Sequence, residues 1–302
     1  MSLPRRRFLR LASSVIALPA VSRIARAQAY PSRPITIVVG FAAGGPDDTS
    51  ARILAERMRN LLGQSIVIEN VTGAGGSIGA GRVARAPADG YTIAFGDFST
   101  HAVNSALYSL SYDIVNDFEP ICLTNNGPFL LVARNSIPAT NFSEFIKFLR
   151  TNPSKATAGT AGVGSVAHVL SILLEKETGS KFQMIPYRGN ALALQDLVAG
   201  QIDFMWDPPA TSMGHIRDKR IKAFAITDTR RLPAAPDIPT RGDRVARTPF
   251  FILAVAVSAK RNSKGYYRYP QCCDCQSFRG TRYTLAICGT GPQHIPQSAA
   301  DS

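Results

Sequence analysis

The strongest constraint on the fold is a regular alternation of apolar, β-type runs with amphipathic helical segments. Residues 35–41, ITIVVGF, form an apolar run rich in β-branched residues, which is typical of a strand buried on both faces. An amphipathic helix follows at 47–63, with capping residues at its start and glycine at its end. A strand at 65–70, a short helix at 77–86 and a strand at 91–97 complete a βαβαβ order. This order predicts a parallel sheet with right-handed crossovers.

The alternation repeats in the second part of the chain. The pattern predicts strands at 128–135, 182–189, 202–207 and 221–227, and helices at 141–153, within 156–179, at 191–201 and around His215. The chain therefore divides into a first lobe at 30–127 and a second lobe at 128–240, both of the α/β class.

Composition fits a folded chain but argues against a nucleic-acid-binding protein. The 302 residues are 45% hydrophobic and carry a formal net charge of +13. The excess positive charge lies in residues 1–29 and 241–302, whereas residues 30–240 are almost neutral. A basic footprint on the folded body is therefore not expected.

Residues 1–29 have the features of an export signal. A basic start precedes a short apolar run, and alanines at alternate positions fit cleavage near 27–29. Arg5 and Arg6, followed by Phe8, favour a twin-arginine signal, with an ordinary secretory signal as the alternative. Either signal predicts a periplasmic protein, and no later segment is long and apolar enough to span a membrane.

Two glycine loops, one in each lobe, precede predicted helices. They read GFAAGGPDDTSARIL (40–54) and GTAGVGSVAHVL (159–170). Free backbone N–H groups and the positive end of the helix dipole favour an anion there, and glycine allows close approach to the backbone. The alternative is a pair of tight turns, with Asp48 or Thr49 as a helix cap. Two such loops facing each other would clamp one anion.

Other chemistries have weaker signals. The stretch GAGGSIGAG (73–81) has a dinucleotide-like glycine spacing, but no acid stands where a ribose ligand is required, so we expect no cofactor. His101 and His215 have no partners at metal-ligand spacing, so we expect no metal site there. A Ser/His/Asp arrangement is not evident, so we expect no catalytic residues and no enzyme activity.

At these motifs the sequence resembles the substrate-binding proteins of tripartite tricarboxylate transporters, the TctC/Bug receptors. The resemblance covers residues 30–240 and includes YPSRPITIVVGFAAGGPDDTSARILAERM, APADGYTIAFG, GTAGVGSVAHV and PYRGNALALQDLVAGQIDFMWD. It implies a two-lobed fold of the type II periplasmic binding protein class, with parallel-rich sheets flanked by helices. It also implies that a glycine loop from each lobe grips a small carboxylate.

The resemblance also implies the ligand-binding residues. For three of these residues a structural role is the alternative to ligand binding. His168 could cap the helix or pack, Arg188 could be a solvated residue at the rim, and Asp207 could belong to a structural hydrogen-bond network. The full set is Ala43, Gly44, Gly45, Asp48, Thr160, Ala161, Gly164, Ser165, His168, Tyr187, Arg188 and Asp207.

The function implied is that of a monomeric periplasmic receptor. It would capture a small organic acid, such as a di- or tricarboxylate or an amino acid, and deliver it to membrane permease subunits. The alternatives are a ligand-dependent partner of a signalling system and, less in keeping with the residues, an α/β enzyme.

The C-terminal segment departs from the resemblance. Residues 241–302 contain the stretch PQCCDCQSF, whose cysteines and distant Cys288 lack the paired groups of a structural zinc site. If the reading frame is shifted forward by one base, the possible codons of residues 259–275 can encode Pro-Lys-Gly-Thr-Pro-Lys-Asp-Ile-Ile-Ala-x-Leu-Asn-Ala-Ala-Ile-Val. This amino-acid sequence resembles the one that the family has at this point. We therefore expect a frameshift at about residue 241. The resulting tail would replace the return of the chain to the first lobe and leave an open sheet edge, with marginal folding.

Overall fold

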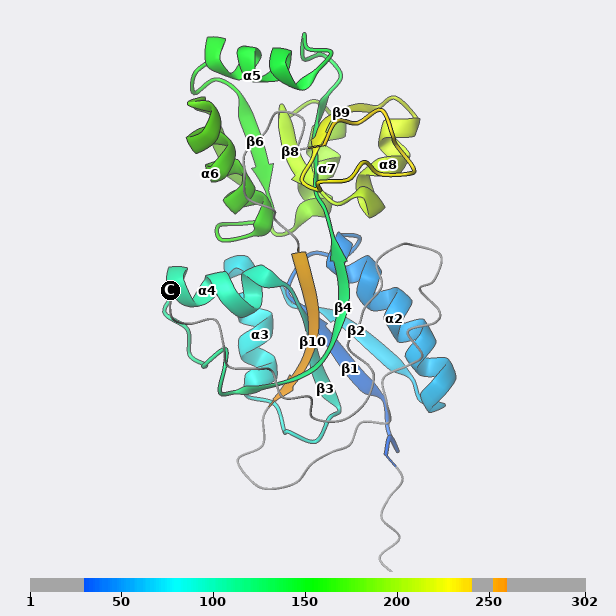
Figure 1. Cartoon of the computed structure of the whole chain (residues 1–302). Coiled ribbons are helices and arrows are strands. Elements are labelled where there is room, and N and C mark those ends of the chain that lie inside the picture. The colour runs from blue at the N-terminus through cyan, green and yellow to red at the C-terminus, as the bar shows by residue number, and fades with distance from the viewer. Residues whose placement is uncertain (1–29, 241–251, 260–302) are drawn as a thin grey trace, which may run out of the picture. The chain divides into compact units, whose positions relative to one another are not determined.

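The computed structural model describes residues 30–240 and 252–259 (Figure 1). From Arg33 onward these residues belong to a single unit that contains two five-stranded sheets. The first sheet has the order β2-β1-β3-β10-β4 and the second β7-β6-β8-β5-β9.

The first sheet is built mainly from the predicted βαβαβ segment. Strand β1 (Ile35–Val39) pairs in parallel with β2 (Ile66–Asn70) and with β3 (Thr92–Gly96). Val39 is fully buried and the other apolar residues of β1 are nearly so, as expected for a strand covered on both faces. Strand β4 (Phe118–Gly127), which the sequence analysis did not predict, lies at the far edge.

The second sheet has parallel neighbours β6 (Thr157–Thr160), β7 (Gln183–Pro186) and β8 (Phe204–Asp207). Strand β5 (Leu130–Arg134) runs antiparallel to β8 and to β9 (Ile221–Ile226). The chain passes from the first sheet to the second in the short step between β4 and β5.

The two sheets have the same topology, and this explains the position of β10 (Ile252–Ala259). In each sheet the fourth strand is antiparallel to its neighbours and arrives from the other half of the chain: β5 enters the second sheet and β10 the first. Figure 1 shows β10, in orange, between β3 and β4.

The expectation that residues 241–302 would replace the return to the first lobe is therefore wrong for 252–259. The sequence ILAVAVSA is an almost wholly apolar run without proline or glycine, so it suits a central strand. It pairs with both β3 and β4, so no edge is left open between these two strands. The Cys-rich stretch and Cys288 lie outside the described residues.

Two helices flank the first sheet, α2 (Pro46–Leu62) and α3 (Ser77–Ala84), as Figure 1 shows. A 3-10 turn, η1 (Ala74–Gly76), leads into α3, and a π-helical turn, η2 (Ser99–Val103), leads into α4 (Asn104–Leu107). Helix α3 lies close to the first sheet at Gly79. A Cβ there would lie 2.9 Å from the carbonyl oxygen of Val71, so the close approach depends on glycine.

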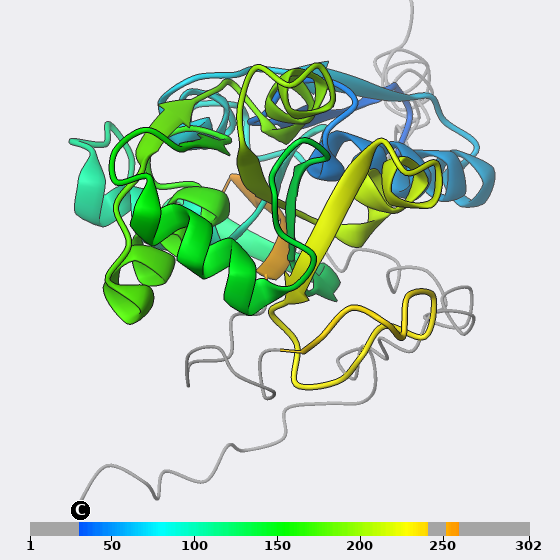
Figure 2. The same cartoon turned by 90° about the horizontal axis from the view of Figure 1, so that it is seen from above.

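The second sheet is covered on both faces by helices. Helices α5 (Phe142–Thr151) and α6 (Val166–Thr178) pack on the face to which Leu131 and Ala133 contribute. Figure 2 shows these two green helices side by side. Helices α7 (Asn190–Val198) and α8 (Pro209–Arg217) pack on the opposite face with Leu130 and Val132. The alternation along β5 follows the two-residue period of a strand.

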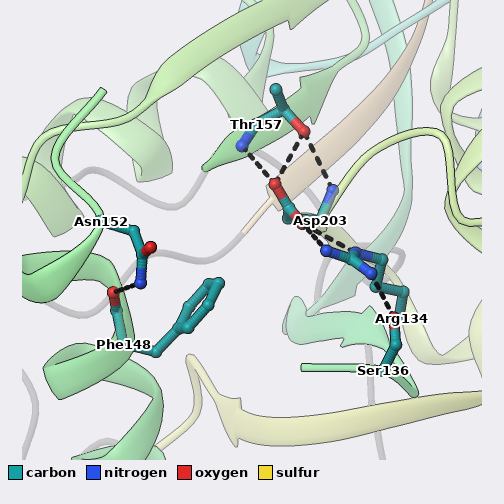
Figure 3. Close-up of polar contacts among 6 residues, drawn as sticks. All are labelled: Arg134, Ser136, Phe148, Asn152, Thr157 and Asp203. Atoms are coloured by element: carbon teal, nitrogen blue, oxygen red, sulfur yellow. Dashed lines mark hydrogen bonds and ion pairs between the residues drawn. The ribbon is translucent and has the colours of Figure 1, made fainter. Parts of the chain in front are cut away.

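A hydrogen-bonded cluster joins three strands at the amino ends of β6 and β8 (Figure 3). Asp203 accepts hydrogen bonds from the backbone N–H of Thr157 at 2.8 Å and from Nε of Arg134 at 2.7 Å. The hydroxyl of Thr157 adds a bond at 3.0 Å, and Arg134 also contacts Ser136. This cluster fixes the end of the sheet opposite to the βα loops.

The elements found confirm the predicted two-lobed α/β fold with parallel-rich sheets. Most helices and strands begin and end close to their predicted limits. Strand β4 and the η2–α4 segment were not predicted.

Candidate functional site

The N-terminal turns of four helices converge on one cavity of about 400 Å³, here called the central cavity. Helix α2 contributes Pro46 and Asp47, and α6 contributes its N-cap Ser165 with Val166 and Ala167. Helix α7 adds Asn190, its first residue, and α8 adds its first turn from the N-cap Pro208. The walls come from both halves of the chain, so a molecule in the cavity contacts both.

The first glycine loop is held by a buried carboxylate. Asp48 is 2% exposed and accepts the backbone N–H of Gly44 at 2.8 Å. It also accepts Nε of Arg52 at 2.8 Å and Nδ2 of Asn70 at 3.0 Å. Burial by itself would raise the pKa of Asp48, but the bonds from Arg52, Gly44 and Asn70 lower it overall. Asp48 therefore positions the loop in this structure, and its predicted contact with ligand stays a prediction.

The second glycine loop is held by the start of α6. The Ser165 hydroxyl accepts the backbone N–H of His168 at 3.3 Å, which makes Ser165 the N-cap. His168 Nδ1 accepts the N–H of Gly164 at 3.4 Å, and burial lowers the pKa of His168. His168 thus contacts the loop backbone, which matches the capping alternative. The fully buried hydroxyl of Thr160 has no hydrogen-bond partner among the described residues.

The contacts between the two halves include two that involve the backbone of the glycine-rich segments. At the first, the N–H of Ala42 donates to the carbonyl of Arg188 at 3.0 Å, and a Cβ on Gly189 would lie 2.9 Å from Ala42 N. At the second, the Tyr108 hydroxyl donates to the carbonyl of Val163 at 3.0 Å. Both glycine-rich segments therefore touch the opposite half through their backbone.

The predicted site residues are divided among three hollows. Ala161 and Ser165 line the central cavity. Tyr187 and Arg188 line a second cavity of about 400 Å³ beside η1, and Ala43 and Gly44 line a larger hollow beside α7. The Tyr187 hydroxyl donates to Asp196 at 2.7 Å. Gly45 accepts the N–H of Thr49 through its carbonyl at 2.9 Å.

Asp207 lies behind the central cavity and supports its wall. Its side chain is fully buried and accepts Nδ2 of Asn190 at 2.8 Å and the hydroxyl of Thr211. Burial raises the pKa of Asp207 to about 7, although bonds from Thr211, Asn190 and Ser212 act in the opposite direction. Asp207 is not among the described lining residues, and it connects the first turns of α7 and α8.

Sequence reasoning missed two acidic residues of the cavity. Asp47 was assigned only to the helix cap, and Asp97 only to the end of a strand. Both line the central cavity. For Asp97 the available signal was its position directly after a parallel strand, because ligands bind at that edge of the sheet.

Within residues 30–240 and 252–259, no group of three or more His, Cys, Asp or Glu side chains is arranged to hold a metal ion. In the same ranges, none of the helices has both the length and the apolar character that crossing a membrane requires.

Comparison with known proteins gives a family match over most of the chain. Residues 50–258 match the model of the tripartite tricarboxylate transporter family receptor, TctC. A UPF0065 protein of Agrobacterium vitis, from the TAR-I ttuE–ttuC′ intergenic region, is 38% identical over 219 residues. That match covers 72% of this chain and 63% of the relative, so the chain spans less than two thirds of the relative's length.

Solved structures that share this fold include MatC and BugD. MatC from Rhodopseudomonas palustris with bound malate is 36% identical, with a TM-score of 0.73 over 76% of this chain and 79% of that one. The periplasmic binding protein BugD is 37% identical, with a TM-score of 0.75 over 78% of this chain and 79% of that one. The family match, the relative and these folds agree, and the chain belongs to the TctC family of tripartite tricarboxylate transporter receptors.

Proposed function

We propose that this protein is a periplasmic receptor that captures a small organic carboxylate in the central cavity and delivers it to a tripartite tricarboxylate-type permease. The observation that carries the proposal is the convergence of four helix N-termini on one cavity. MatC, which has the same fold, is described with bound malate. Binding and closure of the two halves would be the whole mechanism, without covalent chemistry.

The electrostatic basis is the sum of the helix dipoles. Each N-terminus carries a partial positive charge together with backbone N–H groups that have no partner within the helix. Ser165 and Asn190 add polar side chains to the wall, and Phe41 and Phe129 add apolar surface. This mixture of an apolar wall and a few polar groups is typical of small-molecule sites.

Calorimetric titration with a panel of small carboxylates tests the proposal, with malate, succinate, adipate and butanoate as the first members. Ala210 lines the cavity from the exposed first turn of α8, so Ala210→Glu places a negative charge in the cavity without disturbing the core. We expect carboxylate binding to fall at least tenfold. Gly214→Glu on the same helix is the matched control, because Gly214 is exposed and has open space around it. Equal affinity in the two variants would contradict the central cavity as the site.

The transporter partnership needs a separate experiment. Immobilised receptor, loaded with a panel member that binds, should retain the permease subunits from detergent extract more strongly than unloaded receptor does. Retention of a signalling protein in their place would support the sensor alternative.

Periplasmic location depends on residues 1–29, which lie outside the described residues. The paired arginines support the twin-arginine route. Replacing both with lysine, Arg5→Lys with Arg6→Lys, should retain the precursor in the cytoplasm on cell fractionation. Normal export of the double variant would favour the ordinary secretory route.

We also propose a change of reading frame, at the end of strand β10 and not at about residue 241, where the sequence alone led us to expect it. The family match continues to residue 258, and the alternative codon text begins at 259. Sequencing the gene again tests this proposal. If it is correct, codons 259–275 encode the family's amino-acid sequence in the next reading frame.

A further inference from the structure

The central cavity contains two carboxylates from the first half of the chain. Asp47 lies in the first turn of α2 and is half-buried, and Asp97 follows β3 and is 7% exposed. Of the described residues that line the cavity, none is a lysine, an arginine or a histidine. A ligand in this cavity therefore meets two acidic groups that no described basic lining residue offsets.

Asp97 is fixed in position. The hydroxyl of Ser99 donates to its Oδ2 at 2.7 Å, and the N–H of Thr100 donates to its Oδ1 at 3.0 Å. Burial nevertheless raises the pKa of Asp97, and burial together with the charge of Asp97 raises the pKa of Asp47 well above its usual range. Two carboxylates in one cavity repel each other, and a cation between them removes that cost.

The wall contributed by the second half has the opposite character. Helices α6, α7 and α8 all present their N-termini there, through Ser165, Asn190 and Pro209. Helix N-termini favour a carboxylate. Among the described lining residues, the first half contributes one helix N-terminus, that of α2, together with both acids, whereas the second half contributes three helix N-termini and no acid. The cavity is therefore polarised, with its more negative end in the first half and its more positive end in the second.

We propose that the ligand is an amino-substituted carboxylate, whose cationic nitrogen lies between Asp47 and Asp97 and whose carboxylate lies at the N-termini of α6, α7 and α8. This inference rests on the proposed function and names the substrate class of the same cavity. Phe41 and Phe129 supply apolar surface for the carbon chain between the two charged ends. A dianion would place its second carboxylate against the two acids.

Three probes of equal chain length separate these possibilities. They are 4-aminobutanoate, butanoate and succinate, which differ mainly in the group at the far end from one carboxylate. Calorimetric titration of the full receptor at pH 7.5 should show 4-aminobutanoate binding at least tenfold more tightly than succinate or butanoate.

Variants of the two acids give an independent readout. Asp47→Asn and Asp97→Asn should each weaken 4-aminobutanoate at least tenfold and leave succinate unchanged or tighter. Glu177→Gln is the matched control, because it removes one negative charge from an exposed position near the far end of α6. If Asp97→Asn does not fold, Asp47→Asn carries the test, since Asp47 is the less buried of the two.

The outcomes distinguish this inference from the proposed function. Succinate binding as tightly as 4-aminobutanoate, or an unchanged preference in both variants, would overturn the inference while the carboxylate receptor stands. If none of the carboxylates tested binds, the proposed function itself fails.

Discussion

The carboxylate of Asp48 accepts the backbone N–H of Gly44 at 2.8 Å, so the first glycine loop is held by the helix that follows it. Asp48→Ala would leave this N–H without its acceptor, and the amide of Asn70 would keep only its bond to the carbonyl of Phe41 at 2.9 Å. Unsatisfied groups of this kind cost about 1–3 kcal/mol each. We expect the free energy of unfolding to fall by about that amount, measured by urea denaturation, and carboxylate affinity to fall with it.

Arg52→Met is the control for this variant. The side chain of Arg52 is 55% exposed, so its ion pair with Asp48 is expected to contribute about 1 kcal/mol or less. An equal loss of stability in the two variants would show that the ion pair, and not the loop contact, is the main role of Asp48.

Asp207 should make stability depend on pH. Burial raises its pKa in the folded protein to about 7, whereas the pKa of an unfolded aspartate is about 3.9. Between these two pKa values the folded state keeps a proton on Asp207 that the unfolded state loses. The stabilisation that results from this protonated carboxyl is full below about pH 4 and is lost as the pH rises through about 7. The slope reaches about 1.4 kcal/mol per pH unit.

Asp207→Asn removes the titrating group and keeps an acceptor for Asn190. The difference in unfolding free energy between the variant and the parent should therefore shift in favour of the variant from pH 5 to pH 8, in chemical denaturation at each pH. A constant difference across this range would contradict a raised pKa for Asp207.

The sequence predicted the local parts of the fold well because they depend on short-range periodicity. The continuous apolar run of β1 and the capped amphipathic pattern of α2 are complete within a few residues of the chain. The position of a strand within a sheet, by contrast, depends on residues that are distant in the sequence. The place of Ile252–Ala259 between β3 and β4 depends on partners more than 100 residues away, and only the repeated topology makes it understandable.

The same distinction applies to the site. The two glycine loops could be predicted, since a strand, glycines and a helix start stand together in the sequence. Nothing in the sequence brings Asp47 together with Asp97, because 50 positions separate them and only the neighbouring positions of β1 and β3 place both at one cavity. Which hollow Tyr187 and Arg188 line likewise depends on the contact with Ala42.

Gly189 should be needed for contact between the two halves. A Cβ there would lie 2.9 Å from the nitrogen of Ala42, whose N–H donates to Arg188. Gly189→Ala is therefore expected to keep the halves apart and to weaken carboxylate binding at least tenfold in calorimetric titration. Gly200→Ala is the control, since Gly200 also has a positive φ, +79°, but has open space around its Cβ position. Alanine at Gly200 adds backbone strain of about 1–2 kcal/mol. Gly189 has φ 150° and ψ 160°, a conformation almost restricted to glycine, so alanine there adds about 1–3 kcal/mol. Equal affinities would show that this contact does not matter for binding.

The cluster of Asp203, Thr157 and Arg134 should affect stability without affecting binding. Asp203 and Thr157 lie at the amino ends of β8 and β6, whereas the central cavity lies beyond the carboxyl ends of these strands. Asp203→Ala leaves the N–H of Thr157 and the partly buried guanidinium of Arg134 without their acceptor. We expect a loss of about 2–4 kcal/mol in unfolding free energy. Asp203→Asn keeps an acceptor for Thr157, so its free energy of unfolding should fall less than that of Asp203→Ala. Because the cluster is remote from the cavity, both variants should bind carboxylates with parental affinity at temperatures where they are folded. A selective loss of affinity would mean that the two ends of the second sheet are coupled.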